Sequence, residues 1–348
     1  MNAAELSKII DDGDQIGEIS LAGADLRGAA CLGAVFHKVD FQRADLRGMV
    51  LTKAMLSECA LTGARLNGAM LDGASFVNSK LVGADLTDAK AEKASFIKSA
   101  INGALFARAG LAGATFVECD LSTAVFASVR FDKTVIVKCT TEGIDLSDTA
   151  WHRATLMNAD LRTAAMEGAT FFRSTMLEAN FSRRSLRGVN FSTCMLNKAD
   201  LTGCDLTGAN LSQCMLMGAN LAGARLTGAN LRMAMFIGAD LTEADLSGAD
   251  LSNGNIMDAA AAGTRFANAN LYQCIATGLN APESRFDGAN LTYADFSHAV
   301  LDRASLRGLT MERTNLHAIS TLDADFPSRA GALPENKDRT TAENWLRV

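Results

Sequence analysis

The sequence lacks the features that would place the protein in a membrane or on a nucleic acid. No apolar run reaches the ~18 residues of a membrane-spanning helix, and the start, Met1 to Glu5, lacks the basic region and long apolar core of a signal peptide. The 33 Lys and Arg residues against 39 Asp and Glu give a net charge of −6. This balance offers no basic footprint for nucleic-acid phosphates or anionic lipid. We therefore expect a cytoplasmic protein with no membrane span and no direct nucleic-acid binding, and export without a signal stays open.

Recognisable catalytic motifs are missing as well. No HExxH, P-loop, GxSxG or GxGxxG fingerprint occurs, and the sequence has only four His residues. Carboxylates are frequent, but they recur because a short repeat places Asp before Leu, so their spacing is no evidence for paired acid–base chemistry. We expect no catalytic residues, no cofactor and no metal site, and hence a protein that is not an enzyme.

What the sequence has instead is a period of five residues. Neither a 3.6-residue helix nor a flat strand produces such a sustained period, which is the signature of a repeat architecture. A second stripe, two residues earlier in each quintet, is mostly Ala. From Ile16 to Phe326 every fifth position carries Leu, Phe, Ile, Met or Trp, apart from Cys31, Ala91, Thr141, Ala261, Ala276, Ala281 and Thr321.

The two stripes predict one buried side for each quintet. Residues two apart in an extended segment point to the same side, so the large and the small residue both face inward, and the remaining positions turn the chain and face water. The eight cysteines fit these inward positions, and no CxxC motif occurs. We predict buried, reduced thiols. Cys31 takes a large inward position, and the small inward position holds Cys59, Cys119, Cys139, Cys194, Cys204, Cys214 and Cys274.

Many quintets have the form A(D/N)LxG or lie close to it, such as those that begin with Ala-Asp-Leu at 239–241, 244–246 and 249–251. These quintets resemble those of the pentapeptide repeat family, and the resemblance covers most of the chain. It implies an all-β fold, a right-handed quadrilateral parallel β-helix (a pentapeptide-repeat solenoid) with four quintets per coil. At the ~4.8 Å spacing of neighbouring strands, about 15 coils would form a rod. The resemblance also implies a bacterial source.

The repeat predicts three parts of the chain. These are an N-terminal helical cap at 1–15, the pentapeptide-repeat β-helix at 16–326, and a C-terminal tail or cap at 327–348. The pattern at 2–12 predicts a short helix that Asn2 caps and Gly13 ends. In the last part, either Trp345 and Leu346 pack onto the final coil, or the segment is a flexible tail that binds a partner.

One outer face of the predicted β-helix is apolar. With four quintets per coil, residues 20 apart share a face. Exposed apolar area of this extent marks an interface, so we predict a non-enzymatic scaffold or adaptor that binds an unidentified protein, or a second copy of itself, through this face. The residues of this apolar wall are Val77, Ile97, Val117, Val137, Met157, Leu177, Met195, Met215, Met217, Met235, Ile237 and Met257.

Two further functional hypotheses come from the family resemblance. Gyrase-protecting members of the family mimic DNA and bind type II topoisomerases, so DNA mimicry is the alternative function. Its acidic face would be Asp120, Asp160, Asp200 and Asp240, although the same slot holds Thr140, Asn180 and Asn220 in the coils between. Separately, the opening run LAGADLRGA at 21–29 resembles long members that accompany bacterial type VI secretion genes, which predicts a role in that system.

Overall fold

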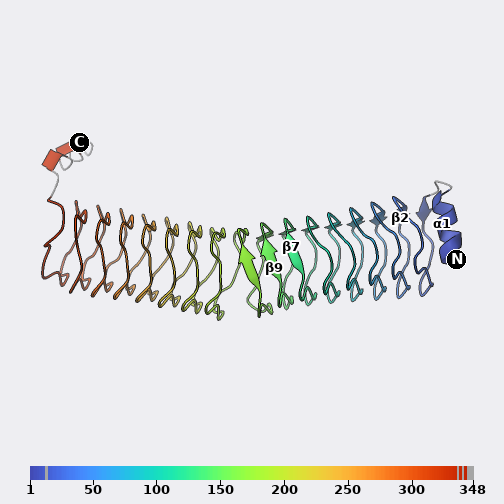
Figure 1. Cartoon of the computed structure of the whole chain (residues 1–348), viewed down its shortest axis with the longest axis horizontal. Helices are drawn as coiled ribbons and strands as arrows, with labels where there is room; N and C mark the ends of the chain where they lie inside the picture. The colour runs from blue at the N-terminus through green and yellow to red at the C-terminus, as the bar shows by residue number, and fades with distance from the viewer. Residues whose placement is uncertain (12–14, 335–336, 339–340, 343–348) are drawn as a thin grey trace. The chain divides into compact units, whose positions relative to one another are not determined.

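The computed structural model describes residues 1–11, 15–334, 337–338 and 341–342. It contains one helix of more than one turn, α1, and a series of very short strands along the chain (Figure 1). Helix α1 spans Ala3–Asp11. The strands are β1 (Ile16–Gly17), β2 (Val35–His37), β3 (Met55–Ser57), β4 (Ser75–Val77), β5 (Ser95–Ile97), β6 (Thr115–Val117), β7 (Arg130–Asp132), β8 (Val135–Val137), β9 (Ala150–His152), β10 (Thr155–Met157) and β11 (Thr170–Phe172).

The strands pair in parallel with partners 20 residues away. An eight-stranded sheet has the order β1-β2-β3-β4-β5-β6-β8-β10, and a three-stranded sheet has the order β11-β9-β7. A 20-residue register means four quintets per turn, which confirms the predicted parallel β-helix. Regular strands of the larger sheet occur in about eight turns of the β-helix. This number is smaller than the predicted number of coils, about 15. Other turns pair through single-residue bridges, such as Asp240↔Ala260 and Ser305↔Asp325.

The chain divides into two compact units, Met1–Ala179 and Asn180–Val348. All eleven named strands lie in the first unit. In the described part of the second unit the turns pair through bridges. The domain boundaries predicted at residues 15 and 326 stay predictions.

Each quintet forms one of the four sides of a turn, and its backbone forms hydrogen bonds with the next turn. In the quintet of Leu26, the N–H groups of Leu26 and Gly28 each donate to a carbonyl one turn later, at 2.9 and 3.1 Å, and the N–H of Ala29 donates back to the carbonyl of Leu26 at 3.1 Å. Gly28 has a φ of 67°, in the left-handed region that glycine adopts without strain. The Oδ1 of Asp25 accepts from the N–H of Arg27 at 3.3 Å. Asp or Asn before Leu therefore serves the turn as an Asx acceptor.

The inward positions form the core as the sequence predicts. The large inward residues stack on those of neighbouring turns, and in the first unit the ring centroids of Phe96 lie 4.9 Å from Phe76 and 4.7 Å from Phe116. Even the polar exception Thr141 is buried, because its hydroxyl donates to the carbonyl of Asp160 at 2.8 Å. Phe172, the one Phe outside the large inward stripe, is 44% exposed.

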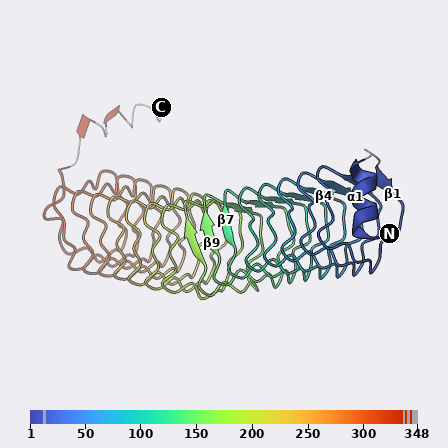
Figure 2. The same ribbon diagram turned by 45° about the vertical axis from the view of Figure 1, so that its right-hand side comes forward.

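The N-terminal helix begins with a capping box. The Oδ1 of Asn2 accepts from the N–H of Glu5, and the Oε2 of Glu5 accepts from the N–H of Asn2, both at 3.0 Å. Leu6 is fully buried, and the hydroxyl oxygen of Ser7 accepts from the N–H of Ala30 at 2.9 Å. Figure 2 shows α1 beside β1 at the first turns. The predicted helix is thus confirmed as α1.

The predictions for Gly13, Trp345 and Leu346 lie outside the described residues. Before that end, the N–H of Leu333 donates to the carbonyl of Thr314 at 2.8 Å, so the chain pairs once more after the repeat. In the part of the chain that the structure describes, no helix is both long enough and apolar enough to cross a membrane.

Candidate protein-interaction surface

The apolar wall of the first unit lies on the eight-stranded sheet. In each three-residue strand the central residue faces inward, so its two neighbours face outward. The outward side chains of successive strands are paired in register, and those of the wall from Val77 to Met157 are half-buried. The register aligns Val77 with Ile97, Ile97 with Val117, Val117 with Val137, and Val137 with Met157. Leu177 is half-buried too, and its carbonyl accepts from the N–H of Asn158 one turn earlier at 3.0 Å.

The apolar wall of the second unit consists of two outward rows. Bridges pair Met195 with Met215 and Met215 with Met235. The other row is held by hydrogen bonds in which Gly218 N–H donates to the carbonyl of Ile237 and Gly238 N–H to that of Met257, both at 3.0 Å. Met217 is 36% exposed, and the other five residues are half-buried. The structure therefore aligns the predicted residues within each unit.

A buried column of hydroxyls and thiols supports the apolar wall of the first unit. In an ordinary quintet the N–H of the small residue bonds back to the large residue, as Ala64 does to Leu61. At Cys59, Ser79 and Cys119, which follow strands of the eight-stranded sheet, it donates instead to a side chain one turn later. The N–H of Cys59 donates to Ser79 Oγ and that of Ser79 to Ser99 Oγ, both at 3.1 Å. We call this set, which is Cys59, Ser79, Ser99, Cys119 and Cys139, the hydroxyl–thiol column.

Members of the hydroxyl–thiol column also donate to carbonyls of the preceding turn. Ser79 Oγ donates to the carbonyl of Leu56 at 3.0 Å, and Cys119 Sγ to that of Phe96 at 3.2 Å. Sequence reasoning placed the cysteines inward but missed this role. The available signal was the recurrence of Ser or Cys in an Ala position every 20 residues. The column lies behind β3, β4, β5, β6 and β8, whose outward residues need not include the Asp or Asn acceptor of an ordinary turn.

The four carboxylates of the acidic alternative act as turn acceptors. Their Oδ1 atoms accept from the backbone N–H two residues later: Asp120 from Ser122 at 3.0 Å, Asp160 from Arg162 at 3.1 Å, Asp200 from Thr202 and Asp240 from Thr242, both at 2.9 Å. Asp160 also forms an ion pair with Arg162 at 2.6 Å. The hydrogen bond from Arg162 lowers the pKa of Asp160. The acidic row thus has a structural role, and the DNA-mimic alternative stays a prediction.

Comparison with models of known protein families shows to which family the chain belongs. The model of the family described as pentapeptide repeats matches the chain in eight copies. Six matched ranges, which together exceed half of the chain, are 18–52, 50–88, 69–108, 176–213, 214–253 and 283–317. The chain belongs to the pentapeptide repeat family. A search of the curated proteins finds no match.

Solved structures similar to this pentapeptide repeat chain include three of the same family. HetL, involved in heterocyst differentiation regulation in the cyanobacterium Nostoc, is 26% identical, with 76% of this chain and 96% of HetL covered and a TM-score of 0.24. QnrB1, a plasmid-mediated fluoroquinolone resistance protein, is 25% identical, with 57% and 89% covered and a TM-score of 0.32. Rfr23 of the cyanobacterium Cyanothece is 22% identical, with 41% and 88% covered and a TM-score of 0.23. The family assignment rests on the repeat matches.

The Asx acceptor of the pentapeptide repeat gives a direct prediction. We expect Asp200→Ala to lower the free energy of unfolding by about 1 kcal/mol, the net value of one lost hydrogen bond. Asp200→Asn should be close to neutral, because Asn keeps the acceptor oxygen. Asn180 and Asn220 hold the same slot one turn away and accept from the N–H groups of Ser182 and Ala222 at 2.9 and 3.0 Å. Chemical unfolding of the two variants measures the difference, and equal losses would show that charge, not the acceptor, matters at this slot.

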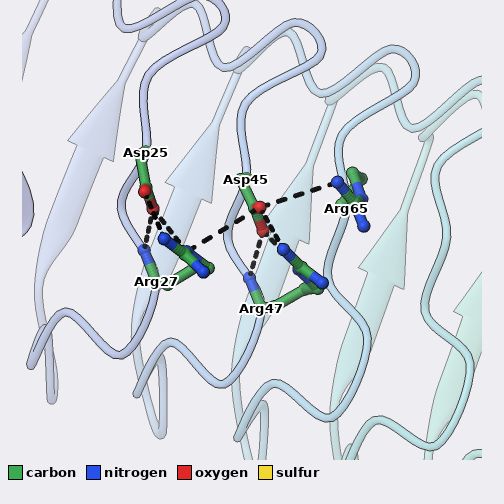
Figure 3. A network of polar contacts seen from close by, with 5 residues as sticks. All are labelled: Asp25, Arg27, Asp45, Arg47 and Arg65. Atoms are coloured by element: carbon green, nitrogen blue, oxygen red, sulfur yellow. Dashed lines mark hydrogen bonds and ion pairs between the residues drawn. The ribbon is translucent and has the colours of Figure 1, made fainter.

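Another face of the first unit carries charges of both signs, which pair with one another. Asp25 lies 2.7 Å from Arg27, and Asp45 lies 2.7 Å from Arg47 and 3.7 Å from Arg65. Figure 3 shows the guanidinium groups and carboxylates alternating along neighbouring turns. The hydrogen bond from Arg27 lowers the pKa of Asp25 to about 2. The pairs make this face a mixed surface rather than an acidic one.

All eight cysteines of the pentapeptide repeat chain lie within the described residues, where they are buried and form no disulfide. Burial raises the pKa of Cys59 to about 11 and those of Cys31 and Cys274 to about 12. These three side chains are therefore neutral thiols at pH 7, which agrees with the predicted structural role.

Proposed function

We propose that the protein is a non-enzymatic scaffold or adaptor that binds another protein, or a second copy of itself, through the apolar wall. The observation that carries the proposal is the row from Val77 to Met157, in which outward apolar side chains lie in register on five neighbouring strands. At the strand spacing the row is about 20 Å long. A continuous apolar strip of this kind is typical of an interface.

The composition of the row supports an interface over a merely strand-compatible surface. Val and Ile suit strands on any face, yet the strands of the other sheet place Asp132, His152 and Phe172 in the corresponding slot. On the wall, the outward residue on the other side of the inward one is Ser or Thr in β4, β5, β6 and β10. A flat strip with one apolar and one hydroxyl edge suits an equally flat partner surface.

The test introduces two positive charges into the row, at residues two turns apart. We expect Ile97→Lys combined with Val137→Lys to abolish association, because two buried cations would lose their hydration at the interface. The two sites lie two turns apart and point outward, so the fold should persist. The matched control is Ala107→Lys combined with Ser147→Lys, which has the same spacing on a different face, where both residues are half-buried. Sedimentation velocity measures self-association, and a pull-down from lysate of the source cells detects a foreign partner.

The association of the wild type, the control and the Ile97/Val137 variant tests the proposal. Association of the wild type and of the control, but not of the Ile97/Val137 variant, supports the proposal. A row variant that associates like the wild type would show that the wall is not the interface. A role in type VI secretion is the finer proposal, which capture of a secretion component by the wild type and not by the row variant would support.

A further inference from the structure

The second unit carries a cluster of methionines on one side of the fold. Five of the 14 methionines of the chain fall between residues 195 and 235, and four of them form two Met-x-Met sequences. These are Met215-Leu216-Met217 and Met233-Ala234-Met235, and Met195 precedes them by one turn. The residues between the methionines, Leu216 and Ala234, are fully buried. Both members of each Met-x-Met sequence therefore lie on the outer surface.

The backbone register brings the methionines of different turns together. Bridges pair Met195 with Met215 and Met215 with Met235, so successive Cα atoms of this row lie about 4.8 Å apart. Hydrogen bonds fix the register: the N–H of Met215 donates to the carbonyl of Cys194, and that of Met235 to the carbonyl of Cys214, both at 2.9 Å. Three thioethers on flexible side chains can thus converge at the level of Met215.

The remaining two methionines flank this row. Met217 lies two residues beyond Met215 and is 36% exposed, and Met233 lies two residues before Met235 and is 54% exposed. Met233 occupies the corner of its turn with a φ of 57°. The Oδ1 of Asn197 accepts from the N–H of Met217 at 3.1 Å, which ties down the polar side chain next to the row. The segments around the cluster, at 193–198, 213–218 and 233–238, contain amide side chains but no carboxylate.

Thioether sulfur is a soft ligand that selects Cu(I) over Mg²⁺ or Ca²⁺. Within the residues that the structure describes, no group of three or more His, Cys, Asp or Glu side chains is arranged to hold a metal ion, so thioethers are the ligand set that the fold gathers. We propose that Met195, Met215 and Met235 form a surface site for a soft monovalent cation, Cu(I) or its analogue Ag(I), with Met217 and Met233 as flanking ligands. Binding involves no change of oxidation state.

The thiols beneath this surface are poor competitors for the ion. Cys194 and Cys214, which directly precede Met195 and Met215, are fully buried on the inward side. Burial raises the pKa of Cys214 well above its ordinary value, so it stays a neutral thiol at pH 7, whereas the thiolate is the metal-binding form. Ion binding at the thioethers needs no opening of the core.

The experiment titrates Cu(I) into the reduced full-length protein without oxygen, in competition with a chromophoric Cu(I) chelator. We expect one ion per chain for the wild type. The variant Met195→Leu, Met215→Leu, Met235→Leu keeps the side-chain volume but lacks the sulfurs. Its affinity should fall at least by the roughly tenfold that loss of even an outer-shell partner of a metal costs. The control Met55→Leu, Met70→Leu removes two exposed methionines of the first unit and should bind as the wild type does.

Other outcomes would overturn the inference. These are a wild type that takes no Cu(I) from the chelator, a triple variant with unchanged affinity, or an X-ray absorption spectrum that shows thiolate rather than thioether ligands. Melting curves establish that the triple variant is folded. The Ile97→Lys, Val137→Lys variant keeps all five thioethers, so it should bind Cu(I) as the wild type does even where association is lost, and failure of the metal site can be told from failure of the proposed interface.

Discussion

Phe96→Ala is expected to lower the free energy of unfolding by about 3–5 kcal/mol, the range for deletion of a fully buried aromatic ring. Phe96 is fully buried between Phe76 and Phe116, whose ring centroids lie at 4.9 and 4.7 Å, and it meets the edge of Phe106 at 6.0 Å. Every one of these contacts is lost with the ring. The neighbouring turns are held at the strand spacing by backbone hydrogen bonds, so they cannot collapse into the cavity.

The matched control for this prediction is Phe172→Ala. Phe172 lies in the first unit as well but is 44% exposed, and it stacks on His152 at 5.5 Å on the outer surface. We expect its removal to cost less than a third of the Phe96 effect. Thermal and urea unfolding of both variants decide the matter, and a comparable loss for the two would mean that the stacked rings do not form the core.

Ser99→Ala is expected to cost about 1–3 kcal/mol, the penalty for a buried polar group left without its partner. Ser99 Oγ accepts from the N–H of Ser79 at 3.1 Å and lies 3.1 Å from the carbonyl of Ile97. Ala has nearly the same size and fits the slot, since Ala occupies it in most quintets. The loss would therefore report the hydrogen bond and not the packing.

Ser99→Cys provides the comparison. The chain itself uses Cys in this column, where Cys139 Sγ accepts from the N–H of Cys119 at 3.4 Å. The thiol should recover part of the stability that Ala loses. Unfolding curves for the wild type, Ser99→Cys and Ser99→Ala should rank in that order. If the Ala variant is as stable as the wild type, the hydroxyl–thiol column does not support the strands of the apolar wall.

The period of five was sufficient to predict which side chains face inward because it is a property of every turn, whereas the four-sided β-helix came from the resemblance to the pentapeptide repeat family. A large residue such as Leu211 and a small one such as Ala209 recur without a slip, and their burial is the largest favourable term in folding. The same regularity limited the functional prediction. In the sequence, Asp200 and Asp240 look like an acidic ladder. In the folded chain their Oδ1 atoms accept hydrogen bonds from the backbone N–H groups of Thr202 and Thr242 in their own turns.

By itself, the sequence determined which residues face inward, the family, and the rows of outward residues that lie 20 apart. A strict periodicity maps directly onto a repeating backbone, so position in the quintet predicts side-chain direction. Tertiary structure alone showed where regular strands replace turns, and that the N–H of Ser79 donates to the hydroxyl of Ser99 in the adjacent turn. It also decided which charges are paired, as between Asp45 and Arg65. It decided as well how far each methionine of the cluster is exposed, as for Met217 and Met233. These features depend on contacts between residues about one turn apart, and contact geometry is a property of the folded chain.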